Sequence, residues 1–263
     1  MKILVTVKEV ATVDDVFEID GAAIDERYLS ADLNEWDEYA IEEAVQLSED
    51  GVVDEVVTVT IGDEDTEQTI RQALAKGADR AIRVWDDALE GVDLLDVGAK
   101  VSILGAVVAA EEPDLVLTGV QSGDDSFGAT GVALAESVDY QWAAVVNQLE
   151  LKSGADRASL HRELEGGIEE RTEVDLPAVL SIQTGINEPR YASLRGIRMA
   201  QRKELEHQTL MDLGVDTDTV AGDLTLTSMY EPESESDTTV FEGSADDTGA
   251  QLADLLREKG VAP

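Results

Sequence analysis

Uninterrupted apolar runs alternate with amphipathic stretches over the first two thirds of the chain. The runs lie at residues 3–7, 56–61, 81–84 and 115–118, and such runs are typical of strands buried on both faces of a parallel sheet. Each run is followed by a stretch with the apolar period of a helix, for example at about residues 64–76. Four strand–helix units in succession predict a doubly wound, parallel α/β sheet with right-handed crossovers.

Local signals add detail to these units. Asn34 precedes three acids in the first turn of a helix, which favours a capping role for it over a ligand-binding one. Asp20-Gly21 predicts a tight turn between two short strands. The buried side of the third helix is predicted to consist of Val97, Val101, Leu104 and Val108.

The pattern changes after Tyr140. Four segments, at residues 143–150, 157–164, 168–175 and 178–183, are spaced like the strands of an antiparallel meander, with a turn at Gly166-Gly167.

The last 50 residues form a separate kind of segment. They carry a stretch rich in Ser, Thr and acids near 231–248, followed by an amphipathic helix, and they are too short for a core of their own. We therefore expect an α/β domain over 1–186, a basic docking segment over 187–206, and a C-terminal arm over 207–263 that packs on a partner subunit.

The charge balance is strongly acidic. The 263 residues include 58 Asp and Glu against 19 Lys and Arg, which gives a formal net charge of −39 spread along the whole sequence. Such a charge excludes a nucleic-acid-binding role, because phosphate neutralisation needs an extended basic surface. It suits a protein that works in concentrated salt, and adaptation to high salt is our hypothesis.

Other classes are excluded by what the composition lacks. The absence of cysteine removes disulfides, thiolate catalysis and zinc–thiolate sites. The two histidines, His161 and His207, are isolated and lack metal-ligand spacing, and no catalytic triad stands out. The sequence opens on a strand and its apolar runs are far shorter than a membrane span, so we expect a cytoplasmic protein without membrane insertion.

One segment departs from the acidic background. Five of the 19 basic residues lie within residues 187–203, together with a single acid, Glu188. The members of this basic island are Arg190, Arg195, Arg198, Arg202 and Lys203, with Tyr191, Leu194 and Ile197 between them. Arginine mixed with apolar residues suits a docking surface. A helix that is merely basic is an equally good interpretation from these residues alone.

A glycine-rich loop follows the fourth strand and opens a helix. Such a loop lies where ligands bind in open α/β sheets, and its amides and helix N-terminus favour a phosphate. Its acids would repel phosphate, so backbone amides must do the binding; an ordinary connecting loop is the alternative. The loop consists of Gly119, Val120, Gln121, Ser122, Gly123, Asp124, Asp125, Ser126, Phe127, Gly128, Ala129 and Thr130.

Several further segments share a resemblance to one family. Residues 32–44, 69–81 and 114–121, and above all 176–179 leading to Asn187-Glu188-Pro189-Arg190-Tyr191, resemble the beta subunits of the electron transfer flavoprotein family. The likeness covers roughly residues 1–215 in the same order. It implies an adenine-nucleotide-binding, flavodoxin-like version of the predicted fold, with antiparallel additions and a C-terminal extension.

The resemblance also implies a function. Family members pair with an alpha subunit that holds most of a FAD, and they relay electrons from dehydrogenases such as acyl-CoA dehydrogenase to acceptors such as a membrane quinone oxidoreductase. The beta subunit carries an adenine nucleotide, AMP or a second FAD. Val120 replaces a residue that is basic in many relatives.

The family's sites fall on particular residues of this chain. Val13 and Trp36 match positions near the flavin, and Leu194 matches a docking leucine with Tyr191, Arg195, Ile197 and Arg198 around it. The nucleotide pocket would consist of Thr6, Asn34, Glu35, Trp36, Asp37, Ile61 and the loop from Gly119 to Thr130.

Two other functions stay open at this point. One is a stand-alone adenine-nucleotide sensor of the universal-stress-protein type, which needs no partner. The other is a nucleotide-activating enzyme, suggested by the string SGDDS at residues 122–126, although the similar loop of ATP pyrophosphatases follows the first strand rather than the fourth. The order and specificity of the matched segments favour electron transfer over both.

Overall fold

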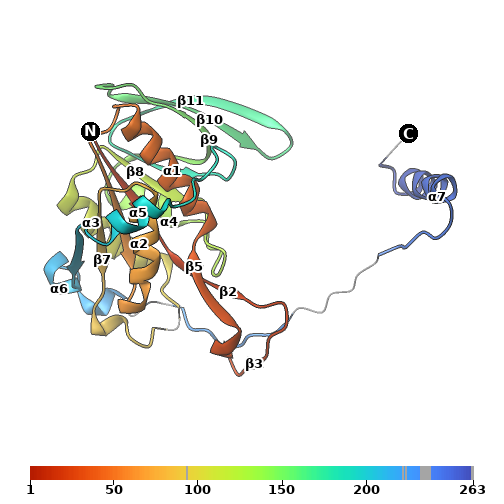
Figure 1. The fold of residues 1–263 in the computed structure, drawn as a ribbon, viewed down its shortest axis with the longest axis horizontal. Helices are drawn as coiled ribbons and strands as arrows, with labels where there is room; N and C mark the ends of the chain where they lie inside the picture. The colour runs from red at the N-terminus through yellow and green to blue at the C-terminus, as the bar shows by residue number, and fades with distance from the viewer. Residues whose placement is uncertain (93, 221, 223, 232–237, 262–263) are drawn as a thin grey trace. The chain divides into compact units, whose positions relative to one another are not determined.

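A mostly parallel sheet of nine strands forms the centre of the described part of the chain (Figure 1). The computed structural model describes residues 1–92, 94–220, 222, 224–231 and 238–261, and it divides into the compact units Met1–Met229 and Tyr230–Pro263. The sheet runs in the order β11-β10-β9-β12-β8-β1-β6-β7-β13. Its strands are β1 (Lys2–Thr6), β6 (Glu55–Ile61), β7 (Arg80–Val84), β8 (Leu115–Gly119), β9 (Gln141–Glu150), β10 (Arg157–Leu164), β11 (Ile168–Asp175), β12 (Ala178–Ile182) and β13 (Leu205–Gln208).

The strand order changes direction between β1 and β8. From β1 the chain passes to β6 and then β7 on one side, and it returns to β8 on the other side of β1. All these pairings are parallel. Loops that leave neighbouring strands in opposite directions open a ligand crevice at the carboxyl ends of those strands, so this is where a site is expected.

Helices cover both faces of the sheet. The main ones are α1 (Glu35–Glu49), α2 (Glu67–Lys76), α3 (Val97–Glu111), α4 (Thr130–Ser137) and α5 (Leu194–Ala200). One core cluster includes Val5, Ile41 and Ile70, and it lies on the side of α1 and α2. The other includes Leu4 and Ile103 and lies on the side of α3 and α4. Burial on both faces explains the uninterrupted apolar runs and confirms the predicted α/β fold class.

Two predictions about elements need correction. β12 is not a strand of the antiparallel meander: it pairs in parallel with both β8 and β9, and all five of its residues are buried. Only β9, β10 and β11 form the meander. The buried side of α3 is also rotated from the prediction, since it includes Ala99, Ile103 and Val107, whereas Val97 and Val101 are partly exposed. The helix is apolar nearly all round, so its periodicity does not identify its inner face.

Smaller elements complete the first unit. β2 (Glu9–Val13) and β5 (Leu29–Leu33) form an antiparallel ribbon, and β3 (Ile19–Asp20) and β4 (Ala23–Ile24) form the hairpin predicted at Asp20-Gly21. A short helix, α6 (Leu210–Leu213), follows β13.

The second unit contains α7 (Ala245–Glu258), which begins with a capping box between Ser244 and Asp247. Within that helix no residue is buried: Leu252 is exposed, and Leu255 and Leu256 are only partly buried. Residues 232–237 of the predicted acidic stretch lie outside the described residues. Along the described ranges, no helix has both the length and the apolar character needed to cross a membrane.

Candidate functional site

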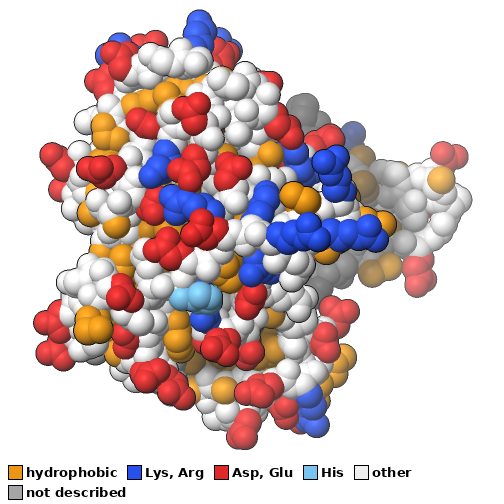
Figure 2. Space-filling view, turned by 60° about the vertical axis from the view of Figure 1, so that its left-hand side comes forward, with side chains coloured by type: hydrophobic (Ala, Val, Ile, Leu, Met, Phe, Trp, Pro, Cys, Tyr) orange, Lys and Arg blue, Asp and Glu red, His pale blue; other side chains and the backbone are white. Residues whose placement is uncertain are grey.

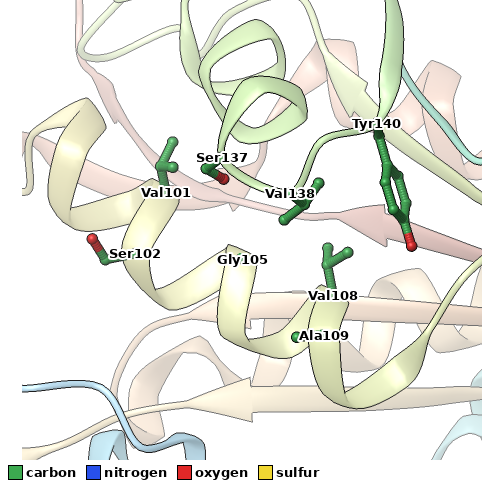
Figure 3. Close-up of a pocket in the computed structure, with 8 residues that line it drawn as sticks. All are labelled: Val101, Ser102, Gly105, Val108, Ala109, Ser137, Val138 and Tyr140. Carbon is green, nitrogen blue, oxygen red and sulfur yellow. The ribbon is translucent and has the colours of Figure 1, made fainter.

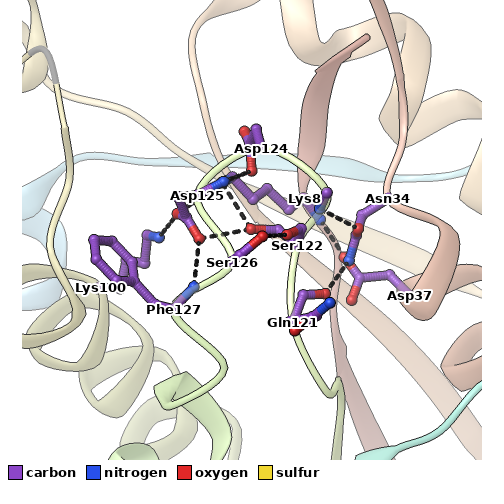
Figure 4. Close-up of polar contacts among 11 residues, drawn as sticks. Lys8, Asn34, Asp37, Lys100, Gln121, Ser122, Asp124, Asp125, Ser126 and Phe127 are labelled. Atoms are coloured by element: carbon purple, nitrogen blue, oxygen red, sulfur yellow. Dashed lines mark hydrogen bonds and ion pairs between the residues drawn. The ribbon is translucent and has the colours of Figure 1, made fainter. Parts of the chain in front are cut away.

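Three segments meet at the carboxyl ends of β1 and β8: the residues after β1, the N-terminus of α1, and the loop from Gly119 to Thr130 (Figure 4). Thr6 and Ile61 end β1 and β6 at the same edge of the sheet. The structure therefore brings most of the predicted pocket residues to one rim.

Asp37 ties two of these segments together. Its side chain is buried, and its two carboxylate oxygens accept hydrogen bonds from the backbone N–H groups of Lys8 (2.8 Å) and Gly119 (3.0 Å). Burial raises the pKa of Asp37 to about 7, although the hydrogen bonds from Lys8, Asn34 and Gly119 act in the opposite direction. A β-carbon at position 119 would lie 2.5 Å from the Asp37 carboxylate, so glycine is needed there.

Asn34 binds the loop instead of capping its helix. It occupies the N-cap position of α1, but its side chain makes no capping hydrogen bond. The amide nitrogen donates to the carbonyl of Gln121 (2.9 Å), and the amide oxygen accepts from the N–H of Gly123 (3.3 Å). The prediction of a capping role was therefore wrong, because the adjacent loop competes for the same side chain.

The acids of the loop are neutralised by two lysines that the sequence did not single out. Lys8 Nζ contacts Asp124 (2.6 Å) and Asp125 (2.9 Å), and Lys100 forms an ion pair with Asp125 as well. Burial alone would raise the pKa of Asp125, but hydrogen bonds from Lys100, Lys8 and Ser122 outweigh it and hold that pKa well below its ordinary range. Phosphate repulsion by the loop is thereby reduced.

The loop also presents unpaired amides. Ser126 and Gly128 adopt left-handed backbone angles, with φ of 52° and 62°. Among the described residues, nothing accepts a hydrogen bond from the N–H groups of Gly128, Ala129 or Thr130, and α4 begins there without a side-chain cap. These donors at a helix N-terminus fit the phosphate of a nucleotide.

The remaining predicted residues lie at varying distances from this network. Trp36 is half-buried. A β-carbon added to Gly119 would lie 2.6 Å from the β-carbon of Trp36, so the two residues are in close contact. Phe127 lies under the ammonium of Lys100, 5.0 Å from nitrogen to ring centre. Glu35 is exposed at the start of α1, and Val13 is 38 % exposed at the end of β2 on the ribbon.

The basic island is divided between anchoring and exposed residues. Arg190 is an anchor, because its guanidinium bonds Glu42 and Glu49 of α1. Burial alone would raise the pKa of Glu42, but hydrogen bonds from Arg190 lower it. Lys203 is a second anchor, donating to the carbonyls of Leu74, Gly77 and Ala78 at the end of α2. Two of the five cations of the basic island are therefore engaged in contacts within the chain.

Between the anchors, the predicted docking residues face solvent. Tyr191 is 97 % exposed and Leu194 is 78 % exposed, and Arg195, Ile197 and Arg198 are exposed as well. The helix α5 that carries four of them packs closely on α2, since a β-carbon at Gly196 would lie 2.4 Å from the Ala75 carbonyl. Figure 2 shows Lys and Arg side chains gathered near the middle of one face, among widespread acids.

A shallow cavity elsewhere does not belong to this site. It measures about 410 Å³ and lies between α3 and the end of α4, where Val101, Val108, Val138 and Tyr140 form much of its lining (Figure 3). Its lining contains no charged side chain and shares no residue with the loop from Gly119 to Thr130. Among the described residues, no group of three or more acids or histidines is arranged to hold a metal ion.

Comparison with known proteins agrees with the resemblance. Residues 22–213 match the electron transfer flavoprotein domain. The chain is 44 % identical to the electron transfer flavoprotein subunit beta of Methylophilus methylotrophus over 264 residues, 98 % of each protein. It is 36 % identical to the mitochondrial subunit beta of Oryza sativa subsp. japonica over 88 % of this chain and 90 % of that protein, and 38 % identical to the subunit beta of Sus scrofa over 76 % of each.

A domain match over most of the chain and a match to a beta subunit over 98 % of each protein agree with the observed fold. The chain belongs to the electron transfer flavoprotein family, among its beta subunits.

Proposed function

We propose that this chain pairs with an alpha subunit and relays electrons from dehydrogenases, such as acyl-CoA dehydrogenase, to an acceptor such as a membrane quinone oxidoreductase. The observation that carries the proposal is the segment 187–203, which is fixed at Arg190 and Lys203 while Tyr191 and Leu194 stand in solvent. An apolar side chain held out from a rigid support, with arginines beside it, suits docking to another protein.

A FAD held mainly by the alpha subunit would supply the redox chemistry. On this chain, Val13 and Trp36 are the residues proposed to lie near it. Tyr191, Leu194, Arg195, Ile197 and Arg198 would contact the dehydrogenase. The described residues of 207–229 belong to the first compact unit, where β13 joins the sheet and Leu210 and Val220 are buried. The part of the predicted arm that would pack on the alpha subunit therefore begins at Tyr230, and α7, in which no residue is buried, would gain cover there.

The adenine nucleotide, AMP or a second FAD, would bind at the rim of the crevice. The unpaired amides of Gly128, Ala129 and Thr130 fit its phosphate, and the pairing of Asp124 and Asp125 with lysines removes the main objection to an anion there. Thr6, residues 34–37 and Ile61 would complete the pocket by their place at the same edge.

Counting ligands in the complex tests the proposal. The chain would be purified with its alpha partner, and FAD and AMP would be extracted and measured per heterodimer. One FAD with one AMP supports a simple relay, whereas two FAD support electron bifurcation. Absence of flavin contradicts the proposal, and a monomer that binds AMP without flavin would support the stand-alone sensor.

A further inference from the structure

The pairing of β1 with β8 stops before the carboxyl ends of these strands. Their parallel pairing ends at Val5 and Leu117, although both strands continue beyond these residues. Past that point the carboxylate of Asp37 spans the gap, with one oxygen on the N–H of Lys8 and the other on the N–H of Gly119. A side chain from α1 thus joins the two strand ends where no backbone pairing does.

The two residues that Asp37 holds are the starting points of the site. Lys8 extends its ammonium to Ser122, Asp124 and Asp125, so the position of its backbone decides whether it reaches the loop. Gly119 is the first residue of that loop. Displacement of either backbone would move the lysine away from the acids that it neutralises.

The surroundings of Asp37 favour two accepted hydrogen bonds. The residue is 4 % exposed, and Asn34 lies beside it at the N-cap of α1. On the β1 side, the positive charge of Lys8 lowers the pKa of Asp37. On the β8 side, Gly119 contributes a backbone hydrogen bond and no side-chain charge. The acids that neighbour it on α1 are directed elsewhere, since Glu35 is exposed and Glu38 pairs with Lys76.

We propose that Asp37 is a positioning residue: its ionised carboxylate fastens the segment after β1 to the loop after β8 and so preorganises the phosphate-binding amides. Protonation turns one oxygen into a hydroxyl, which is a poorer acceptor for the second N–H. Local opening of the loop, unlike global unfolding, leaves Asp37 buried in the fold but without these donors, so ionisation favours the closed loop and the loop tightens as pH rises through neutrality. The raised pKa of Asp37, about 7, agrees with this range. The consequence for ligand affinity rests on the proposed nucleotide site.

The test uses Asp37→Asn and a matched control, Asp114→Asn. Asp114 also accepts a hydrogen bond from a β1 backbone N–H, that of Lys2 (2.7 Å), but at the opposite end of the same strands. Both variants and the wild type would be prepared as the full chain with its alpha partner, freed of nucleotide. Hydrogen exchange of residues 119–130 and the Kd for AMP would be measured at pH 6 and pH 8, at one salt concentration.

We expect Asp37→Asn to lower the protection of the loop amides at least tenfold at pH 8 and to weaken AMP binding at least tenfold. After correction for intrinsic exchange rates, the loop amides of wild type and Asp114→Asn should be better protected from hydrogen exchange at pH 8 than at pH 6. The loop amides of Asp37→Asn should show no such increase. Because the AMP phosphate also titrates near pH 6, the effect of pH on Kd is read as the difference between Asp37→Asn and the other two proteins.

Loop protection and AMP affinity within twofold of wild type in Asp37→Asn would overturn the inference, as would equal losses in Asp114→Asn. If Asp37→Asn does not fold, the wild type alone decides: loop protection that stays constant from pH 6 to pH 8 overturns it. Failure of the wild type to bind AMP contradicts the nucleotide site instead, and the exchange measurements still test the role of Asp37.

Discussion

At the scale of single residues, the candidate nucleotide site depends on ion pairs between the acids of its loop and two lysines that lie far from the loop in sequence. Lysine is scarce in this chain, yet two lysines converge on Asp125. Without them, the partly buried acids of the loop would face one another and any bound phosphate. The lysines therefore make an acidic loop compatible with an anionic ligand.

Replacing Lys8 by methionine tests this role. Methionine keeps an apolar stem of similar length but removes the ammonium, so Asp124 loses its cation and Asp125 keeps Lys100 alone. We expect the Kd for AMP to rise about tenfold, which corresponds to about 1.4 kcal/mol. Calorimetric titration of the complex would measure it. Lys152→Met removes the same charge from an exposed turn and should leave the Kd unchanged; an equal loss there would show a general effect of net charge instead.

Asp37 also gives the stability a particular dependence on pH. Its pKa rises from 3.8 in the unfolded chain to about 7 on folding, so the folded state binds the proton more tightly. This proton linkage adds its full amount to the free energy of unfolding below about pH 4, and the amount decreases from there until it is lost as pH rises through 7. At 1.36 kcal/mol per pKa unit, the full change is roughly 4 kcal/mol. The unfolding free energy of the wild type minus that of Asp37→Asn should fall by about this amount between pH 4 and pH 8. Urea titrations in constant salt would measure it, and a difference that rises with pH would contradict it.

Residue roles were only partly visible in the sequence. The positions of Asn34 and Asp37 at the start of a helix could be predicted, but not the directions of their side chains. Those directions depend on Gln121, Gly123 and Gly119, which are more than 80 residues away in sequence. Lys8 had one available signal, its place directly after the first strand.

At the scale of elements, local patterns predicted what each segment is but not always where it lies. The run Ala178–Ile182 is buried at every residue, as in a central parallel strand, yet its spacing after three antiparallel strands suggested a fourth. Strand order is decided by long-range pairing, which spacing does not encode. The basic island likewise required the structure to separate Arg190 and Lys203 from the exposed residues.

The exposed helix α5 gives a direct test of docking. Leu194→Ala removes an exposed apolar side chain without disturbing the anchors, so electron transfer from a dehydrogenase should fall at least tenfold while the flavin content stays the same. Met211→Ala, which truncates an exposed apolar residue on α6, serves as the control. Dehydrogenase coupling that is unchanged in Leu194→Ala would leave the segment with a structural role only.

At the scale of the whole molecule, the net charge of −39 dominates. The acids greatly outnumber the cations that could pair with them, since the chain has 58 Asp and Glu against 19 Lys and Arg. Their mutual repulsion opposes the compact state, and salt weakens it, because the screening length falls from about 10 Å at 0.1 M to about 3 Å at 1 M.

We therefore expect the thermal midpoint of unfolding to rise by more than 10 °C between 0.1 M and 2 M NaCl. Scanning calorimetry of the complex would measure it. Sucrose at matched osmolality is the control, because it stabilises without screening. A midpoint that does not depend on NaCl, or that rises equally with sucrose, would contradict adaptation of this chain to high salt.

The two anchors of the segment 187–203 bear on how fast and how tightly a partner is captured. Arg190 is fixed to α1 and Lys203 to α2, while the residues between them remain free for contact. Much of the conformational entropy that a flexible loop would lose on association has already been lost during folding. The proposed docking surface would therefore need few contacts to form a complex, and a small interface that also releases its partner quickly would suit the proposed role of an electron carrier between proteins.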